Sequence, residues 1–206
     1  MGAKDTLFGN RVSLSSALFL SNYDNQQLSE IIDLVNYLEN AGKAQIYGFE
    51  FKGDALLAKG VRANVSLSLL HTEYKELVLS GQNLAGNRLP FAPAATLSAG
   101  IDWDVARFAG GQLTFSPRVN FQGLTYFEPQ NSVGPNGDFN MQQDAYAKVN
   151  ASLAWVRDKL TMRLFVNNAF DKETFAWGTD LQHSFGLDYL IRDPPRTFGG
   201  SVRYDF

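Results

Sequence analysis

The chain of 206 residues has no cysteine, which excludes disulfides, thiolate zinc sites and cysteine nucleophiles. Histidine is scarce, because only His71 and His183 occur and they lie far apart in the chain. No serine motif accompanies either histidine, so we expect a protein that is not an enzyme. Basic residues are not in excess: the formal net charge is -3, whereas a surface that binds nucleic-acid phosphates needs to be positive.

The sequence also lacks any run of about eighteen apolar residues, so no membrane-spanning helix is expected. Barrel strands that cross a membrane escape this test, because every second residue in them is polar. Aromatic side chains are abundant, at 13% of the chain, with 16 Phe and 8 Tyr. This content is typical of a barrel with interfacial aromatic girdles.

The last eleven residues, 196–206, alternate without interruption between two kinds of side chain. A period of two places alternate residues on opposite faces of a strand. The apolar face holds Phe198, Gly200, Val202, Tyr204 and Phe206, and the polar face holds Thr197, Gly199, Ser201, Arg203 and Asp205. A bare aromatic row on a terminal strand is a pairing hazard in a soluble protein, whereas in a transmembrane barrel it faces lipid.

The same alternation recurs along the whole chain and predicts an all-β antiparallel meander of eight or nine strands. The predicted strands lie near 11–23, 44–56, 61–69, 97–103, 113–121, 147–155, 160–166 and 196–206, with a weaker one at 2–7. Tight turns at 9–10, 58–60, 109–111 and 157–159 alternate with long loops near 24–43, 75–94, 126–143 and 171–195. Short periplasmic turns and long extracellular loops are typical of outer-membrane barrels, so we predict a partial one.

Three large aromatic side chains test this orientation. Trp103, Trp155 and Tyr204 lie on lipid-facing rows, and each falls near the turn end of its strand, where interfacial Trp and Tyr are favoured. Residues 29–38 are less certain, because their apolar spacing also fits a short helix capped by Ser29. For this segment we favour strand and loop over helix.

The polar rows predict a set of lumen-facing side chains. Such residues can touch a plug, line a water path or bind solute, and we favour plug and water contact over specific recognition. They are Glu50, Lys52, Arg62, Asn64, Asp102, Arg118, Asn120, Gln122, Lys148, Asn150, Arg163, Asn167 and Arg203.

Ligand recognition is expected in the long loops instead, because loops on a rigid scaffold carry binding residues. The candidate contacts there are Tyr126, Phe127, Phe139, Phe175, Trp177, His183, Phe185 and Tyr189. Oxygen-bearing residues between Asn131 and Asp144 hint at calcium, but they lack the carboxylate density and closing glutamate of a calcium loop. No metal and no cofactor is predicted.

Several segments resemble TonB-dependent outer-membrane receptors. Residues 195–199 (PRTFG) with 203–206 (RYDF) are similar to the last barrel strand of that family, and 167–172 (NNAFDK) resembles the segment that ends the penultimate strand. Residues 40–50 (NAGKAQIYGFE) and 87–93 (NRLPFAP) resemble further parts of the same barrel. The resemblance covers essentially the whole chain, and the order and spacing of these motifs make it specific.

The resemblance implies a plugged barrel of roughly 22 strands in the outer membrane of a Gram-negative bacterium. Such receptors import scarce nutrients, commonly iron siderophores, cobalamin or carbohydrates, with energy passed on by TonB. Because no plug, TonB-contacting segment or signal peptide is evident, we expect residues 1–206 to be the C-terminal segment of the barrel, coupled to TonB through the absent part. Expected partners are outer-membrane lipid, the remaining strands, the plug, a small nutrient, and the barrel-assembly machinery, which would read Phe198, Tyr204 and Phe206.

Two other readings remain open at this point. The chain could form a small self-standing outer-membrane barrel or porin, which requires closure with few strands. It could also be a soluble β-sandwich or barrel that binds an apolar ligand, with the aromatic rows filling its core.

Overall fold

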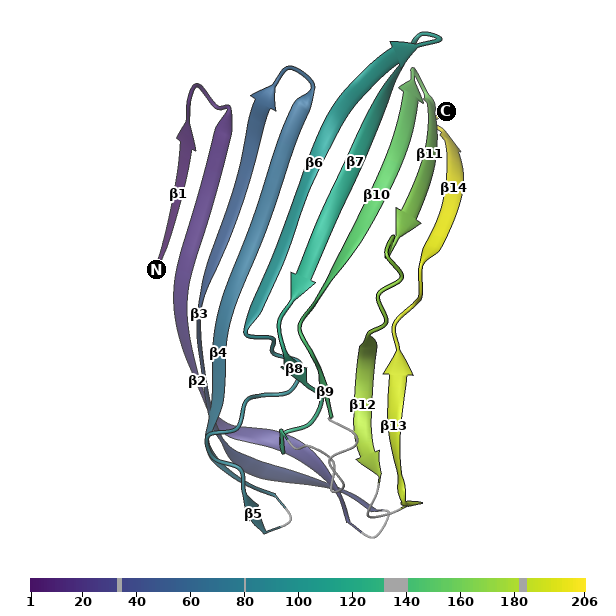
Figure 1. Ribbon diagram of the computed structural model, residues 1–206. Coiled ribbons are helices and arrows are strands. Elements are labelled where there is room, and N and C mark those ends of the chain that lie inside the picture. The colour runs from purple at the N-terminus through teal and green to yellow at the C-terminus, as the bar shows by residue number, and fades with distance from the viewer. Residues whose placement is uncertain (33–34, 80, 132–140, 182–184) are drawn as a thin grey trace.

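The computed structural model describes residues 1–32, 35–79, 81–131, 141–181 and 185–206, and the side chains at 26 and 28–41 are not considered. Nine strands follow one another in a single antiparallel sheet (Figure 1). They are β1 (Gly2–Leu7), β2 (Val12–Ile32), β3 (Val35–Ala58), β4 (Val61–Leu79), β6 (Ala95–Phe108), β7 (Gly111–Gln122), β10 (Tyr146–Arg157), β11 (Leu160–Asn167) and β14 (Thr197–Tyr204). The predicted all-β meander is confirmed.

The predicted alternation of short turns and long loops is also found, but the loops contain more structure than expected. β2 and β3 run far past the predicted strand ends, so segment 29–38 is strand on both sides of residues 33–34, and the helix alternative is wrong. Smaller strands lie within the other loops: β5 (Gln82–Asn83), β8 (Thr125–Tyr126), β9 (Gln142–Gln143), β12 (Phe175–Leu181) and β13 (Leu187–Arg192). β12 and β13 form a hairpin at the loop end (Figure 1).

The register of the sheet brings every predicted apolar row onto one face. Residues that pair across neighbouring strands share a face, so the pairs can be followed from strand to strand. They include Leu14–Gly53, Phe51–Leu67, Leu67–Leu97, Leu97–Phe121, Phe115–Leu153, Leu153–Leu164 and Val166–Phe198. The apolar rows therefore form one continuous surface, as a wall that faces lipid requires.

Aromatic residues mark both limits of this apolar surface. At the turn end Trp103 pairs with Val61, the first residue after a tight turn, and is 51% exposed. At the loop end the Tyr47 ring stacks on His71, with ring centroids 4.7 Å apart. This is the arrangement of interfacial girdles on either side of a hydrocarbon layer. No helix long and apolar enough to cross a membrane is found among the described residues.

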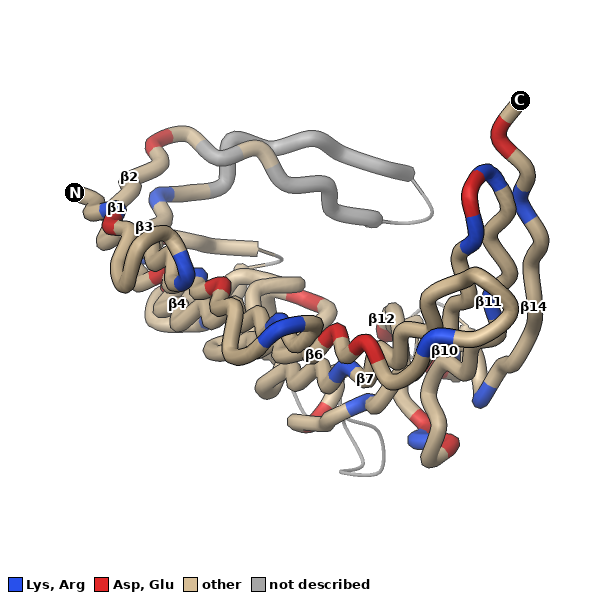
Figure 2. Tube along the Cα trace, turned by 90° about the horizontal axis from the view of Figure 1, so that it is seen from above, with Lys and Arg blue, Asp and Glu red and all other residues tan. Residues whose placement is uncertain are grey.

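The sheet is an open arc and does not close into a barrel. Among the described residues β1 pairs only with β2, and β14 pairs only with β11. Figure 2 shows the two chain ends at opposite ends of this arc. The described residues therefore form part of a barrel wall, which argues against a small self-standing barrel.

A small apolar core lies at the loop end, where residues 84–92 fold back onto β3 and β4. Tyr74 and Leu77 are each 1% exposed and pack with Ala44, Leu84 and Leu89. Backbone hydrogen bonds hold this packing, because the Tyr74 N–H donates to the Asn87 carbonyl at 2.9 Å. The loop is thus an ordered lining for this part of the wall.

Replacement of Val149 by arginine should cost about 2–4 kcal/mol of folding free energy, because the side chain faces lipid near mid-strand. Ser152 lies on the opposite face of the same strand, β10, so Ser152→Arg should cost much less folding free energy. Urea titration of the full receptor refolded in phospholipid vesicles measures both. Equal costs at the two positions would refute the assigned faces.

Tyr74→Phe should raise the free energy of unfolding by about 1 kcal/mol, since a buried polar atom without a partner is costly. The Tyr74 hydroxyl is buried and has no hydrogen-bond partner among the described residues. The same titration tests this, with Tyr47→Phe, at an exposed ring, as the neutral control. A loss of stability in Tyr74→Phe alone would reveal a hidden partner for the hydroxyl.

Candidate functional site

The polar face of the wall carries cross-strand hydrogen bonds between side chains of β4, β6 and β7. The Arg118 guanidinium donates to Asn64 at 2.9 Å, and its second nitrogen lies 3.9 Å from the Asp102 carboxylate. The Ser116 hydroxyl donates to the same carboxylate at 2.6 Å. Arg118 and Asp102 nevertheless keep about two-fifths of their side-chain surface exposed. These predicted lumen residues therefore form a connected polar surface that can still contact a further partner.

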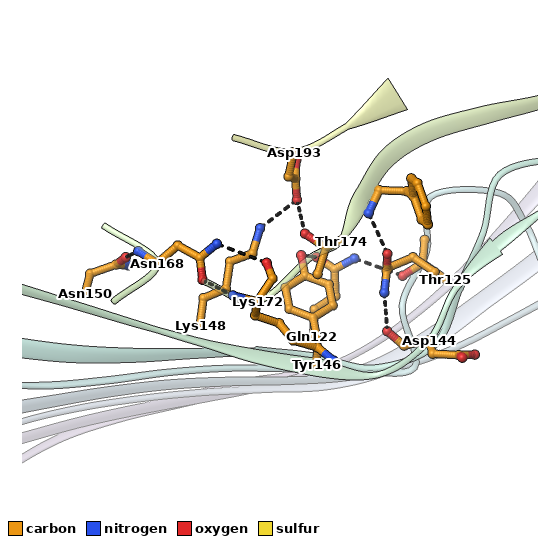
Figure 3. Close-up of polar contacts among 12 residues, drawn as sticks. Gln122, Thr125, Asp144, Tyr146, Lys148, Asn150, Asn168, Lys172, Thr174 and Asp193 are labelled. Atoms are coloured by element: carbon orange, nitrogen blue, oxygen red, sulfur yellow. Dashed lines mark hydrogen bonds and ion pairs between the residues drawn. The ribbon is translucent and has the colours of Figure 1, made fainter. Parts of the chain in front are cut away.

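A denser polar network joins this wall to the loops (Figure 3). The Lys148 ammonium on β10 donates to the Asp193 carboxylate at 2.8 Å, and the Thr174 hydroxyl donates to the same oxygen at 2.7 Å. Lys148 also lies over the Tyr146 ring, 5.2 Å from its centroid. Because the ion pair is more than three-quarters buried on both sides, its geometry fixes the chain just before β14.

Asn168 shapes the connection that follows β11. Its side-chain oxygen accepts from the Lys172 N–H at 2.8 Å, and its side-chain nitrogen donates to the Lys172 carbonyl at 3.0 Å. Its own N–H donates to Asn150 on β10 at 2.8 Å. Asn168 has a φ of 50°, a left-handed conformation that asparagine tolerates better than most residues. The NNAFDK segment is therefore a tight turn tied to the wall.

Gln143 links two of the loops. The Gln143 side chain on β9 accepts from the Phe175 N–H on β12 at 2.6 Å and donates to the Asp144 carbonyl at 2.8 Å. On the neighbouring wall, the Tyr146 hydroxyl donates to Gln122 at 3.3 Å, and Gln122 donates to Thr125 at 3.0 Å. Figure 3 shows Gln122, Thr125, Asp144 and Tyr146 close together where the strands meet the loops.

Glu128, in the loop after β8, holds the β12–β13 hairpin through two hydrogen bonds. One carboxylate oxygen accepts from the Thr179 hydroxyl and from the Asp180 N–H, each at 2.8 Å. Burial raises the pKa of Glu128, the two hydrogen bonds lower it in part, and the nearby carboxylates of Asp180 and Asp188 raise it further. The net result is a pKa above the ordinary value of a glutamate.

The β12–β13 hairpin presents one apolar face outward and packs its other face on the neighbouring loop. On the packed face Gly178 lies so close to Leu190 and Phe127 that a Cβ there would meet them at 2.5 and 2.9 Å. On the other face the rings of Trp177 and Tyr189 meet edge to face, with centroids 6.0 Å apart. These rings are 37% and 52% exposed, so they are available to a ligand.

The predicted ligand contacts do not form a single cluster. Trp177 and Tyr189 are in contact, and Phe185 is 61% exposed at the tip of the same hairpin. Phe127 is only 5% exposed and packs between loops, while Tyr126 and Phe175 are half-buried. Phe139 and His183 lie outside the described residues.

The residues that hold the loops were not predicted from the sequence. Glu128, Thr174 and Asp193 lie in non-periodic segments, so no pattern separated them from ordinary polar loop residues. Asn131 and Asp144 were considered only as weak candidates for calcium ligands, and the structure shows other contacts for both. The Asn131 side chain binds the backbone of Arg88, accepting at 2.6 Å and donating at 2.9 Å, and Asp144 accepts from Gln142 at 2.9 Å.

An amphipathic antiparallel wall with short turns at one end and hydrogen-bonded loops at the other defines an outer-membrane barrel protein. Residues 1–169 match the family described as TonB dependent receptor-like, beta-barrel, and the chain belongs to that family. This places it in the outer membrane of a Gram-negative bacterium and excludes the soluble alternative. The family is one of transport receptors, not of enzymes.

Similar proteins support the same assignment. The chain is 26% identical over 199 residues to the pesticin receptor of Yersinia pestis, covering 95% of this chain and 27% of that protein. The crystal structure of the ferric yersiniabactin uptake receptor FyuA from Yersinia pestis superposes with a TM-score of 0.80 at 24% identity, over 100% of this chain and 29% of that one. The crystal structure of the siderophore receptor PiuA from Acinetobacter baumannii superposes with a TM-score of 0.71 at 18% identity, over 98% of this chain and 26% of that one. The chain thus spans about a quarter of the length of these proteins.

Replacement of Glu128 by glutamine should remove a pH dependence of hairpin docking. Because folding raises the pKa of Glu128, docking is strongest below the unfolded value of about 4.3 and weakens as pH rises through the folded pKa. Glutamine keeps the acceptor oxygen and does not titrate. Hydrogen exchange of the Asp180 amide should therefore show protection that declines with pH in the wild-type receptor relative to Glu128→Gln. A ratio independent of pH would contradict the assignment.

Proposed function

We propose that this chain is the C-terminal part of the barrel of an outer-membrane active transporter that imports a scarce nutrient, with energy delivered through TonB. Among iron siderophores, cobalamin and carbohydrates, the iron-siderophore class is favoured, because two of the similar structures are a ferric yersiniabactin uptake receptor and a siderophore receptor. The proposal rests on one observation: a lipid-facing wall carries, at one end, exposed loops that side-chain hydrogen bonds hold in place.

The two ends of the polar surface have different roles in this proposal. The wall residues around Arg118 and Asp102 contact the plug and water, because they are about two-fifths exposed and partly paired within the wall. The aromatic pair Trp177–Tyr189 contacts the nutrient, because flat exposed rings on an anchored hairpin offer apolar contact area at low entropic cost.

The termini of the sheet have proposed partners as well. The exposed edges of β1 and β14 pair with the other strands of the barrel, and TonB acts through the plug side of the full receptor. The barrel-assembly machinery reads the closing strand through strand addition, with Phe198, Tyr204 and Phe206 as its aromatic signal. These side chains are 83%, 55% and 105% exposed.

Trp177→Ala should lower the affinity of the full receptor for its ferric siderophore by roughly tenfold, since loss of one aromatic contact costs about 1–2 kcal/mol. The measurement is uptake and surface binding of radioactive iron complexes by cells that have no other receptor for them. Phe170→Ala is the matched control, because Phe170 is 80% exposed and lies outside the hairpin.

Both variants must reach the outer membrane in equal amounts for this comparison. Uptake that disappears without TonB supports the transporter assignment. Iron-complex binding that is unaffected by Trp177→Ala would reject the aromatic pair, and uptake that persists without TonB would reject active transport.

A further inference from the structure

The short turns at the periplasmic end of the sheet are basic. The four turn segments 8–11, 57–60, 107–111 and 157–159 contain five basic residues and one acidic residue. All five are exposed: Arg11, Lys59, Arg107, Arg157 and Lys159. Figure 2 looks onto this end, and basic segments lie on successive turns along the arc.

Acidic partners neutralise several cations at the loop end, and at the turn end Arg203 is likewise paired with Asp205 at 2.7 Å. Lys43 pairs with Glu76 at 2.7 Å, and Arg192 pairs with Glu173 at 3.2 Å. Arg157 forms a long ion pair with Asp158, 3.7 Å apart, and keeps 54% of its side chain exposed. Lys159 is exposed and has no ion pair among the described residues. Arg157 and Lys159 are therefore the turn-end cations most available to an external anion.

Two adjacent turns combine these cations with an aromatic platform on the lipid-facing side. The Trp155 indole donates to the Phe108 carbonyl at 3.2 Å, and the two rings lie 5.9 Å apart. Arg157 lies two residues further along β10, on the same face as Trp155, and its guanidinium covers Gly110 of the neighbouring turn. Lys159 follows in the next turn, so two cations stand just beyond the aromatic level.

The neighbouring strand completes this site on its other side. The Asp205 N–H donates to the Lys159 carbonyl at 2.9 Å, which holds the end of the chain against the turn. The rings of Tyr204 and Phe206 meet edge to face at 5.3 Å. Lys159 thus lies between two aromatic pairs, both at the level where the apolar surface ends.

We propose that this turn-end surface binds anionic phospholipid headgroups of the periplasmic leaflet, with Arg157 and Lys159 as the principal site. The apolar rows of the wall lie in hydrocarbon, so the groups immediately beyond the aromatic girdle are lipid headgroups. The cations attract the lipid phosphate, and the aromatic rings pack on its glycerol and upper acyl segments. A net-anionic headgroup is preferred to a zwitterionic one, whose own ammonium the cations repel.

Native mass spectrometry of the purified full receptor tests this proposal by titration with phosphatidylglycerol or phosphatidylcholine of identical acyl chains. The wild-type receptor should bind phosphatidylglycerol more tightly. The double variant Arg157→Gln/Lys159→Gln should lose roughly 30-fold in that affinity, or about 1 kcal/mol per cation, with little change for phosphatidylcholine. The matched control Lys43→Gln/Arg192→Gln removes two cations at the loop end and should bind both lipids as the wild type does.

A salt titration of the wild-type receptor gives a second test that needs no variant. The preference for phosphatidylglycerol should shrink as ionic strength rises, since screening shortens the reach of exposed charges. Equal affinity of the wild type for the two lipids, or unchanged phosphatidylglycerol binding in Arg157→Gln/Lys159→Gln, would overturn the proposal. Competition by soluble glycerol phosphate as strong as that by the lipid would also overturn it, because the membrane surface would then contribute nothing.

Discussion

The structure depends on a register that keeps the alternating apolar rows of successive strands on one face while every strand hydrogen-bonds to its neighbours. In hydrocarbon an unpaired backbone group costs several kcal/mol, so a strand can cross a membrane only as part of a paired sheet. A slip of one residue would turn an entire row, such as that of β14, toward the wrong medium. The aromatic girdles, the polar face and the position of the loops all follow from this constraint.

The wall residues at the loop end have two tasks. Three polar residues of the sheet also bind residues of the loops. Lys148 binds Asp193, Asn150 binds Asn168, and Gln122 binds Thr125. Because the wall is rigid, a few such hydrogen bonds are enough to hold long loops in place. The β12–β13 hairpin is held in the same way by Glu128 and Gln143, and its aromatic face stays exposed.

Polar and charged residues are divided between the two ends according to what surrounds them. At the loop end several acidic and basic groups pair with each other, and the resulting contacts shape the loops. At the turn end Arg157 has only a long ion pair with an exposed carboxylate, next to Trp155 and Phe108, where we propose that lipid headgroups bind. In the two proposals, one sheet has a binding surface on one side of the membrane and an electrostatic anchor on the other.

The sequence alone determined the features that repeat along each strand. Period-two alternation located the nine strands and their faces, and the PRTFG, NNAFDK and RYDF segments indicated the family, because these signals are local and independent of distant contacts. Tertiary structure decided the extent of β2 and β3, the β12–β13 hairpin, and the partners of Glu128, Asn131 and Asp193. It also showed that Phe127 is buried whereas Trp177 is exposed. These features rest on single contacts between residues up to about fifty positions apart, which leave no periodic trace in the chain.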